Sequence, residues 1–282
     1  MIYLGTSGFK YDDWKGTFYP AGLKEKDWLP YYARHFNALE IDSTYYRLMH
    51  PAVFYRLAEK VPSGFHFTVK TYRTLTHEIS EGSRDDLTAF LQSIRPLQEA
   101  GKFGCIIAQF PNSFHRNPQS LAYLADLRHR FGDLPLAVEF RHKGWASEEV
   151  FQFFREQKIA FVCVDEPQFP TLMPPVAAIT ADFAYLRFHG RNYHTWWKSG
   201  DAKLRYDYRY SAQELEEWLP RIKVLSGQTG GLYIFMNNHF RGQAAANATE
   251  LQAMLESQLG ESFPRPSSRP PVQTFLPMDA ER

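Results

Sequence analysis

Eight short apolar runs, distributed along a chain of 282 residues, constrain the fold more than any other feature of the sequence. They lie at residues 2–6, 38–42, 65–70, 104–110, 134–140, 160–165, 183–190 and 231–237. Several are almost continuously apolar, which is typical of parallel strands that are buried on both faces. Their average spacing of about 33 residues matches one strand–helix–strand step of roughly 30 residues. The spacing and length predict one α/β domain over residues 1–260, a single (β/α)8 TIM barrel.

Helix signals fill most of the gaps between these runs. The predicted starts carry capping residues: Ser83, Asn117 followed by Pro118, Ser211 with Glu214, and Asn247 with Glu250. The fifteen residues 166–180 instead contain four prolines, which disfavour a helix interior, so the barrel is expected to be slightly irregular there. The proline-rich tail, residues 261–282, is expected to be either disordered or wrapped across the barrel surface.

Bulk properties limit the class of protein and its partners. The formal net charge is +1, so no global field favours nucleic acid or an anionic membrane as partner. The two cysteines, Cys105 and Cys163, lie within apolar runs and are expected to be buried thiols of a reducing compartment. No apolar segment approaches the roughly 18 residues of a spanning helix, and no secretory signal is recognisable. We therefore expect a cytoplasmic protein with no membrane partner.

Polar residues cluster at the ends of the predicted strands, where a parallel barrel carries its functional groups. The strand ends offer Thr6, Ser7, Glu40, Asp42, Lys70, Gln109, Glu139, Arg141, Asp165, Arg187, His189, Asn237 and Asn238. Residues two apart share a strand face, so Glu139 points the same way as Arg141. A buried Glu139 needs a partner, which predicts a network with Arg141 or Arg187. That network is either part of a site or a structural ion pair closing the barrel.

Three residues are the catalytic candidates. Glu139 and His189 are placed to act as acid or base, and an imidazole at a strand end also suits a metal ligand. Asp165 is placed to orient His189 or to bind substrate. The alternatives are a satisfied core histidine and, because Pro167 follows closely, a loop-start role for Asp165.

Aromatic residues make up 16% of the chain, and many fall in the predicted loops after the strands. Beside basic residues they favour a cleft that stacks a ring and pairs with an anion, although packing between loops is the alternative. The candidate ligand-binding residues are Tyr11, Trp14, Asp42, Tyr45, Lys70, Arg73, Gln109, Arg141, Trp145, Arg187, Asn237 and Asn238.

A metal site and several enzyme classes find little support in the sequence. Carboxylates and His189 at the strand ends are ligands that suit Mg, Mn or Zn, but no compact ligand spacing is present and the arginines compete for them. We assign no metal ligands and leave the cofactor open. Glycine-rich phosphate loops and a GxSxG elbow are absent, which disfavours nucleotide hydrolysis and serine hydrolase chemistry.

Ordered motifs extend over most of the chain. They are GTSGFKYDDWKGTFYP at 5–20, LEIDSTYYR at 39–47, FTVKTYRTLTH at 67–77, QFPNSF at 109–114, VEFRHKGW at 138–145, YLRFHGR at 185–191 and FMNNHFRGQAAANA at 235–248. Over about residues 2–259 the chain resembles the family called domain of unknown function 72, or YecE-like. The resemblance implies a TIM barrel and a cytoplasmic bacterial or archaeal protein, and it brings no established reaction. Asp42 stands where the family often has Asn, Asn112 replaces a usual Pro, and Met236 departs from the usual strand end.

Two functional hypotheses follow, and the sequence leaves the choice open. The first is an enzyme acting on a phosphorylated sugar or nucleotide-like anionic ligand by acid/base chemistry of Glu139 or His189. In that hypothesis Arg141, Arg187 and Lys70 hold the anion and Asn237 orients the substrate. The alternative is a non-catalytic protein that binds a nucleotide or single-stranded nucleic acid in the same aromatic and basic cleft. A barrel with a merely structural polar rim is a third option.

Overall fold

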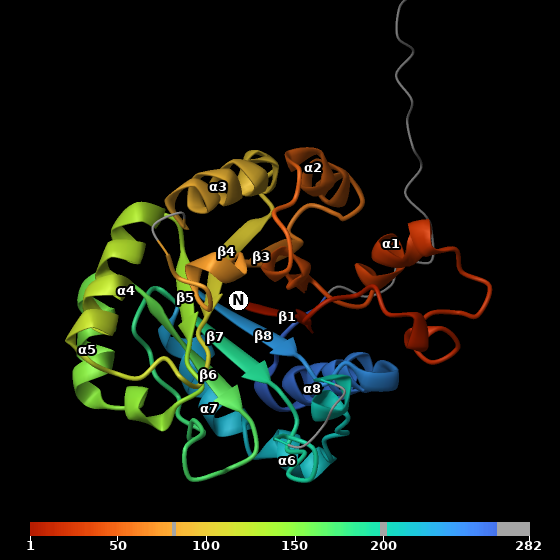
Figure 1. Ribbon diagram of the computed structural model, residues 1–282. Helices are drawn as coiled ribbons and strands as arrows, with labels where there is room; N and C mark the ends of the chain where they lie inside the picture. Colours follow the sequence, from red (N-terminus) through yellow and green to blue (C-terminus); the bar gives the residue numbers. More distant parts are fainter. Residues whose placement is uncertain (81–82, 198–201, 264–282) are drawn as a thin grey trace, which may run out of the picture.

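The structure, a computed structural model, describes residues 1–80, 83–197 and 202–263 and has the architecture of a (β/α)8 TIM barrel (Figure 1). Its eight parallel strands are β1 (Ile2–Thr6), β2 (Ala38–Ile41), β3 (His66–Lys70), β4 (Phe103–Gln109), β5 (Leu136–Glu139), β6 (Ala160–Asp165), β7 (Phe183–Phe188) and β8 (Gly231–Met236). Neighbouring strands pair in the order β1-β8-β7-β6-β5-β4-β3-β2. A bridge between Ser7 and Glu40 brings the two edges together. The fold prediction is confirmed.

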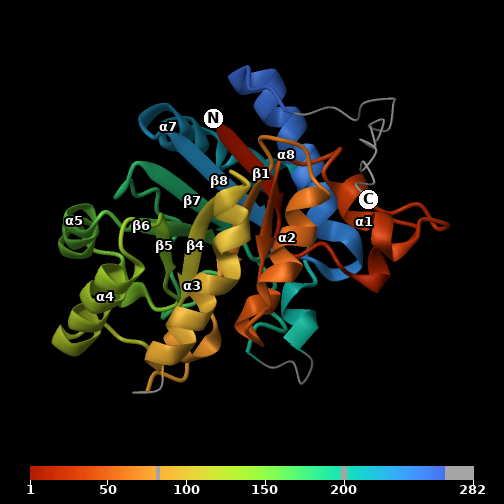
Figure 2. The same ribbon diagram turned by 90° about the horizontal axis from the view of Figure 1, so that it is seen from above.

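Helices surround the sheet on its outer side, as both ribbon views show (Figures 1 and 2). They are α1 (Trp28–Tyr32), α2 (Pro51–Glu59), α3 (Ser83–Glu99), α4 (Pro118–Phe131), α5 (Glu148–Gln157), α6 (Ala212–Glu216), α7 (Leu219–Gln228) and α8 (Gln243–Leu259). Short 3-10 turns lie at Asp12–Trp14, Glu25–Asp27, Ser43–Tyr45, Arg73–Leu75, Lys143–Trp145, Ala202–Tyr206 and Phe240–Gly242. The described residues 166–182, between β6 and β7, contain no helix, as the prolines predict.

The predicted helix starts are mostly confirmed. Asn117 accepts a hydrogen bond from the backbone N of Ser120, and Ser211 with Glu214 forms a capping box. The start predicted at Asn247 is wrong, because α8 already begins at Gln243, after Gly242 has adopted a left-handed conformation with φ of 79°. Asn247 lies buried inside that helix, so its amide bonds neighbouring groups instead of capping.

The interior of the barrel is filled with polar and aromatic groups. At the strand starts, Tyr3 stacks on His66 and on Tyr233 with ring centroids 4.0 and 4.8 Å apart. Above them the hydroxyl of Tyr185 donates to Glu40 Oε2 at 2.6 Å and bonds Thr68 Oγ1 at 2.9 Å. Alternation along β7 places Arg187 on the same inner face as Tyr185. A column of hydrogen-bonding groups therefore leads to the strand ends.

The burial predicted for the two cysteines is confirmed. Cys105 and Cys163 are free and buried, and burial raises the pKa of both thiols.

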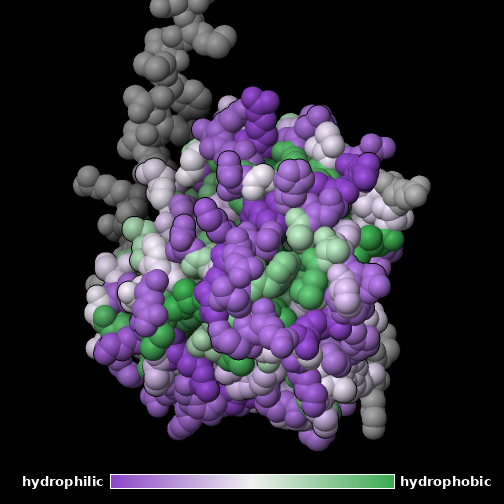
Figure 3. Space-filling view, turned by 90° about the vertical axis from the view of Figure 1, so that its left-hand side faces the viewer, coloured by the Kyte–Doolittle hydropathy of each residue, from purple (hydrophilic) through white to green (hydrophobic). Residues whose placement is uncertain are grey.

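The side that carries α4 and α5 is mainly hydrophilic, with small apolar patches between polar side chains (Figure 3). Within the described ranges, no helix is both long enough and apolar enough to cross a membrane. Of the predicted tail, residues 264–282 lie outside the described residues.

Candidate functional site

Arg187 forms the centre of a charged cluster at the strand ends. Its Nη1 donates to Glu139 Oε2 at 2.6 Å and its Nη2 to Glu40 Oε1 at 2.6 Å, joining β7 to β5 and β2. All three side chains are buried. Burial acts to raise the pKa of Glu139, but the neighbouring guanidinium groups of Arg187 and Arg141 outweigh it and hold that pKa well below its usual range. The cluster is therefore charged at neutral pH.

Arg141 extends the cluster outward and bridges two carboxylates. Its Nη2 lies 3.0 Å from Glu139 Oε1, and its Nη1 donates to Glu166 Oε2 at 2.7 Å. Burial raises the pKa of Glu166 to about 7, against the influence of Arg141. The side chain of Arg141 is 13% exposed, and its guanidinium lies 5.9 Å from the ring centre of Trp196. The sequence predicts a network of Glu139 with Arg141 or Arg187, and in the structure Glu139 contacts both arginines.

His189 Nε2 and Glu139 Oε1 lie next to each other in this cluster. The amide of Asn237 lies 2.9 Å from His189 Nδ1; since that amide nitrogen only donates, Nδ1 accepts and the ring proton is on Nε2. Burial and Arg141 lower the pKa of His189 to about 3, so the ring is neutral. Nε2 lies 3.2 Å from Glu139 Oε1. Neither atom makes a well-directed hydrogen bond among the described residues, although both are buried.

Lys70 occupies the end of β3 beside this pair. Its Nζ donates to Gln109 Oε1 at 2.9 Å and lies 4.6 Å above the ring of Tyr45. Burial lowers the pKa of Lys70 to about 8, and Arg187 acts in the same direction. In the part of the chain that the structure describes, Lys70 forms no ion pair with a carboxylate, whereas Arg141 and Arg187 are both paired.

The charges of the cluster almost cancel. Four carboxylates, of Glu40, Asp42, Glu139 and Glu166, face three cations, of Lys70, Arg141 and Arg187. The two guanidinium groups already lie between carboxylates, so an incoming anion meets Lys70 and the outer edge of Arg141. No group of three or more His, Cys, Asp or Glu side chains in residues 1–80, 83–197 and 202–263 is arranged to hold a metal ion.

Asp165 lies apart from the cluster, contrary to the role proposed from the sequence. It is in register with Phe188, whose ring packs on Tyr210 and Trp218, and both side chains face the outer helices. Its carboxylate accepts hydrogen bonds from the Tyr210 hydroxyl, from Trp218 Nε1 and from Arg191 Nη2, each at 2.7 Å. The carboxylate therefore bonds groups on the outer side of the barrel, and the contact of Asp165 with His189 is made by its backbone carbonyl, which accepts from His189 N at 2.8 Å.

We therefore predict that Asp165→Ala lowers the free energy of unfolding by about 3 kcal/mol, because buried donors lose a charged acceptor. Glu217→Ala is the matched control, since Glu217 pairs with the same Arg191 at 2.8 Å but is 53% exposed. The control should change stability by less than about 1 kcal/mol. Urea unfolding monitored by circular dichroism measures both, and equal losses in the two variants would contradict this assignment.

Two tryptophans predicted to stack a ligand instead pack between elements. Trp14 and Trp145 are completely buried. Trp14 Nε1 donates to the carbonyl of His239 at 2.7 Å. Trp145 stacks on Phe140 with centroids 4.0 Å apart, and its Nε1 donates to the carbonyl of Phe114 at 2.7 Å. Both anchor loops on the barrel, which is the packing alternative noted above.

Two polar candidates also lie outside the cluster. Asn238 is buried and donates to the carbonyl of Tyr208 at 2.8 Å and to Asn247 Oδ1 at 2.9 Å. Arg73 forms an ion pair with Glu78 at 3.0 Å and is half-exposed. These residues hold the loops that follow β8 and β3.

Several members of the cluster are absent from the candidates drawn from the sequence. Glu40 was recognised only as a strand end, and Tyr185 was not singled out. Glu166 follows Asp165, and strand alternation would have placed it inward once Asp165 faced outward. His77 lies beside Tyr45 with centroids 4.9 Å apart, and burial lowers the pKa of His77 to about 4. Its position within the TYRTLTH motif was the available signal.

A cavity of about 650 Å³ adjoins the cluster between α1 and α2. Glu40 and Asp42 lie among its lining residues. The pKa of Asp42 is raised mainly because the side chain is buried, and the neighbouring Glu40 acts in the same direction. Tyr11, which stacks on His239 at 4.6 Å, also lines it. The rest of its wall is largely apolar, with Leu29, Leu39, Ile41, Met49, Val53 and Leu57. Two predicted ligand-binding residues, Tyr11 and Asp42, thus line a cavity that touches the cluster.

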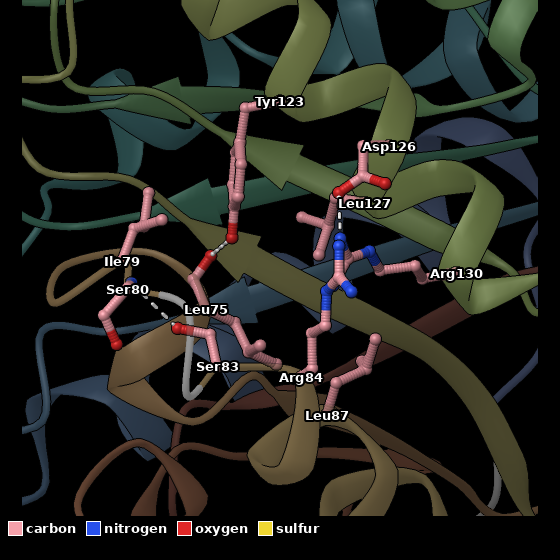
Figure 4. A pocket seen from close by; sticks show the side chains of 10 residues that line it. All are labelled: Leu75, Ile79, Ser80, Ser83, Arg84, Leu87, Tyr123, Asp126, Leu127 and Arg130. Atoms are coloured by element: carbon pink, nitrogen blue, oxygen red, sulfur yellow. Dashed lines mark hydrogen bonds and ion pairs between the residues drawn. The ribbon is translucent and has the colours of Figure 1, made fainter.

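A second pocket of about 550 Å³ lies on the outside of the barrel, among side chains of α3, α4 and the loop after β3 (Figure 4). Tyr123 donates to the carbonyl of Leu75 at 2.8 Å at one side, and Arg130 pairs with Asp126 at 2.7 Å at the other. None of the strand-end cluster lines this pocket. We therefore place the candidate site at the strand ends.

Comparisons with known proteins agree with this architecture. The family model described as "Protein of unknown function DUF72" matches residues 3–271. The UPF0759 protein YunF of Bacillus subtilis is 30% identical over 94% of this chain and 98% of its own length. A crystal structure of a DUF72 family protein from Thermotoga maritima has a TM-score of 0.84 and 40% identity, covering 91% of this chain and 99% of that one. One from Enterococcus faecalis has a TM-score of 0.83 and 30% identity, covering 96% and 99%.

Proposed function

The chain belongs to the DUF72 family of proteins of unknown function, and from the site itself we propose that it is an enzyme acting on a small phosphorylated sugar or similar anionic ligand by acid/base chemistry. The observation that carries the proposal is the pair formed by Glu139 Oε1 and His189 Nε2. The two atoms lie 3.2 Å apart and are buried, and neither makes a well-directed hydrogen bond among the described residues, although Glu139 Oε1 also lies 3.0 Å from Arg141 Nη2. Buried polar atoms in this state call for a partner.

A hydroxyl or carbonyl oxygen of a ligand fits the chemistry of this pair. The protonated Nε2 of a neutral imidazole donates to the ligand oxygen and polarises it. The ionised Glu139 accepts a proton from the ligand. Asn237 supports both roles by fixing the imidazole tautomer.

The charge balance of the site favours a small ligand over a nucleic acid. Lys70 and the partly exposed edge of Arg141 receive one phosphate group, because Arg187 is buried between two carboxylates. Trp14 and Trp145 are buried, so they offer no stacking surface to the bases of a nucleic acid. Two of the aromatic residues on which the single-stranded nucleic-acid alternative was based are therefore not available for stacking.

We predict that ribose 5-phosphate and inorganic phosphate raise the melting temperature of the protein, whereas ribose does not. Lys70→Met should weaken phosphate binding about 10-fold, the value of one charge-assisted hydrogen bond. Lys102→Met is the matched control, because Lys102 donates only to the carbonyls of Ala58 and Val61, away from the strand ends. Calorimetric titration gives both affinities, and equal binding by the two variants would argue against Lys70 as the anion contact.

Proton transfer itself can be followed by exchange of ligand hydrogens with D2O. Sugar phosphates incubated with the wild-type protein should incorporate deuterium, as measured by NMR. Glu139→Gln and His189→Gln should each slow this exchange by about 100-fold, a typical loss for an acid or base. Circular dichroism verifies that each variant is folded. Sugar phosphates that neither bind nor exchange would refute the proposal.

A further inference from the structure

Lys70 is chemically distinct from the other cations of the cluster. Among the described residues its Nζ has one hydrogen-bond acceptor, Gln109 Oε1, and the amide of Gln109 is held in place because its Nε2 donates to the carbonyl of Phe110 at 2.8 Å. The ring of Tyr45 covers a second side of Nζ at 4.6 Å. The side chain is also partly exposed. An amine in this position can lose its proton without leaving a carboxylate unpaired.

Lys102 shows the opposite arrangement in the same chain. Its Nζ donates to two backbone carbonyls, of Ala58 at 2.6 Å and Val61 at 2.7 Å, which fix its position. Within the described part of the chain, neither of these hydrogen-bond partners belongs to the strand-end cluster. Lys102 therefore stabilises a loop, whereas Lys70 lies at the candidate site.

We propose that Lys70 is a nucleophile that forms an imine with the aldehyde or ketone carbon of an open-chain sugar phosphate. The inference rests on the proposed function and narrows its substrate class to ligands that carry both a carbonyl group and a phosphate.

The chemical step needs no reactant beyond the ligand and water. The unprotonated Nζ donates its electron pair to the carbonyl carbon, and the carbon–oxygen π pair moves to oxygen, which takes up a proton. One proton leaves the nitrogen of this adduct to give the neutral carbinolamine, whose hydroxyl group takes up a proton and departs as water to give the protonated imine. Loss of the remaining nitrogen proton gives the neutral imine. Hydrolysis reverses both steps. The protons exchange with solvent because the side chain of Lys70 is partly exposed.

The surroundings of Lys70 favour this step. Burial lowers its pKa to about 8, so roughly a tenth of the amine is unprotonated at pH 7, against less than about 0.1% for an exposed lysine. His77, whose pKa burial lowers to about 4, and Tyr45 add no charge beside it. A protonated imine withdraws electrons from the neighbouring carbon, so a C–H bond there becomes acidic, and Glu139 is the base proposed to accept its proton.

Borohydride trapping tests the inference directly. The full chain is incubated with dihydroxyacetone phosphate, reduced with sodium borohydride, digested and mapped by mass spectrometry. Lys70 should carry the reduced adduct at about 10-fold the level of Lys102, because its larger unprotonated fraction outweighs its lower intrinsic nucleophilicity. Lys70 labelled no more than Lys102 would overturn the inference.

Two variants separate the nucleophile from the anion contact. Lys70→Arg keeps the positive charge and should bind inorganic phosphate while losing the adduct at this position. Lys70→Met should lose both. If phosphate compounds bind the wild-type protein but leave no adduct at residue 70, the imine is refuted and the proposed function stands. If dihydroxyacetone phosphate neither binds nor labels, both fail, and labelling by unphosphorylated dihydroxyacetone to the same extent would remove only the phosphate requirement.

Discussion

Glu139→Ala is expected to lower the free energy of unfolding by about 3–5 kcal/mol, the usual result of removing one partner from a buried ion pair. Glu139 accepts from Arg187 at 2.6 Å and lies 3.0 Å from Arg141. Removing the carboxylate leaves two guanidinium groups in a dry environment without their shared counter-charge. Urea unfolding monitored by far-UV circular dichroism gives the change, provided that the slope of the transition is unchanged.

An exposed ion pair provides the control for this prediction. Glu99 pairs with Arg95 on the surface of α3, one turn apart, with both side chains more than half exposed. Glu99→Ala should change stability by less than about 0.5 kcal/mol. A Glu139→Ala variant no less stable than Glu99→Ala would mean that water or local rearrangement compensates the arginines, and the cluster would then not be the rigid frame described here.

Arg187→Met is expected to lower the free energy of unfolding by a similar amount at neutral pH, and this destabilisation should depend on pH. In the wild-type protein the folded-state pKa of Glu139 is depressed, so its contribution is present above the unfolded pKa and is lost as the pH falls. Without Arg187, burial becomes the larger influence, the folded-state pKa of Glu139 rises, and the folded variant takes up a proton. The stability of the variant is then lost as the pH rises.

The difference in unfolding free energy between the wild-type protein and Arg187→Met should therefore grow from pH 5 to pH 8, by up to about 1.4 kcal/mol per pH unit for each proton involved. At pH 7 it should reach about 3–5 kcal/mol. Denaturation curves at several pH values measure this slope. Arg95→Met, which removes an exposed guanidinium, should give a difference that is nearly independent of pH. A flat difference for Arg187→Met would show that the carboxylates remain ionised without it.

The barrel could be predicted from the sequence because its signal is repeated. Each strand is a short apolar run separated from the next by room for a helix or a long loop, and several helices begin at side-chain caps such as Asn117 and Ser211. The start of α8 was misplaced because Gly242 begins that helix through its left-handed backbone. Asn247 has the residue type of a cap, but the tertiary packing uses its amide to bond Tyr210 instead.

The cluster could be predicted only in part, because sequence alone does not give the inward face of a strand. Glu139, Arg187 and His189 were found by their position at strand ends and their spacing of two. Asp165 also ends a strand, yet it faces outward, and the inward position belongs to Glu166. The buried tryptophans show a second limit of prediction from sequence. The same aromatic residue types occur in loops that pack on the barrel and in loops that contact a ligand.

The polar column inside the barrel has an evolutionary consequence. Tyr185 forms hydrogen bonds with Glu40 and Thr68, and Glu40 accepts a hydrogen bond from Arg187. Each side chain in the column thus satisfies a donor or an acceptor of the next one. A substitution at one of these positions leaves an unmatched donor or acceptor at its neighbour. Strong epistasis should therefore link them, and viable changes inside the barrel should occur in concerted groups, while the outer helices diverge one residue at a time.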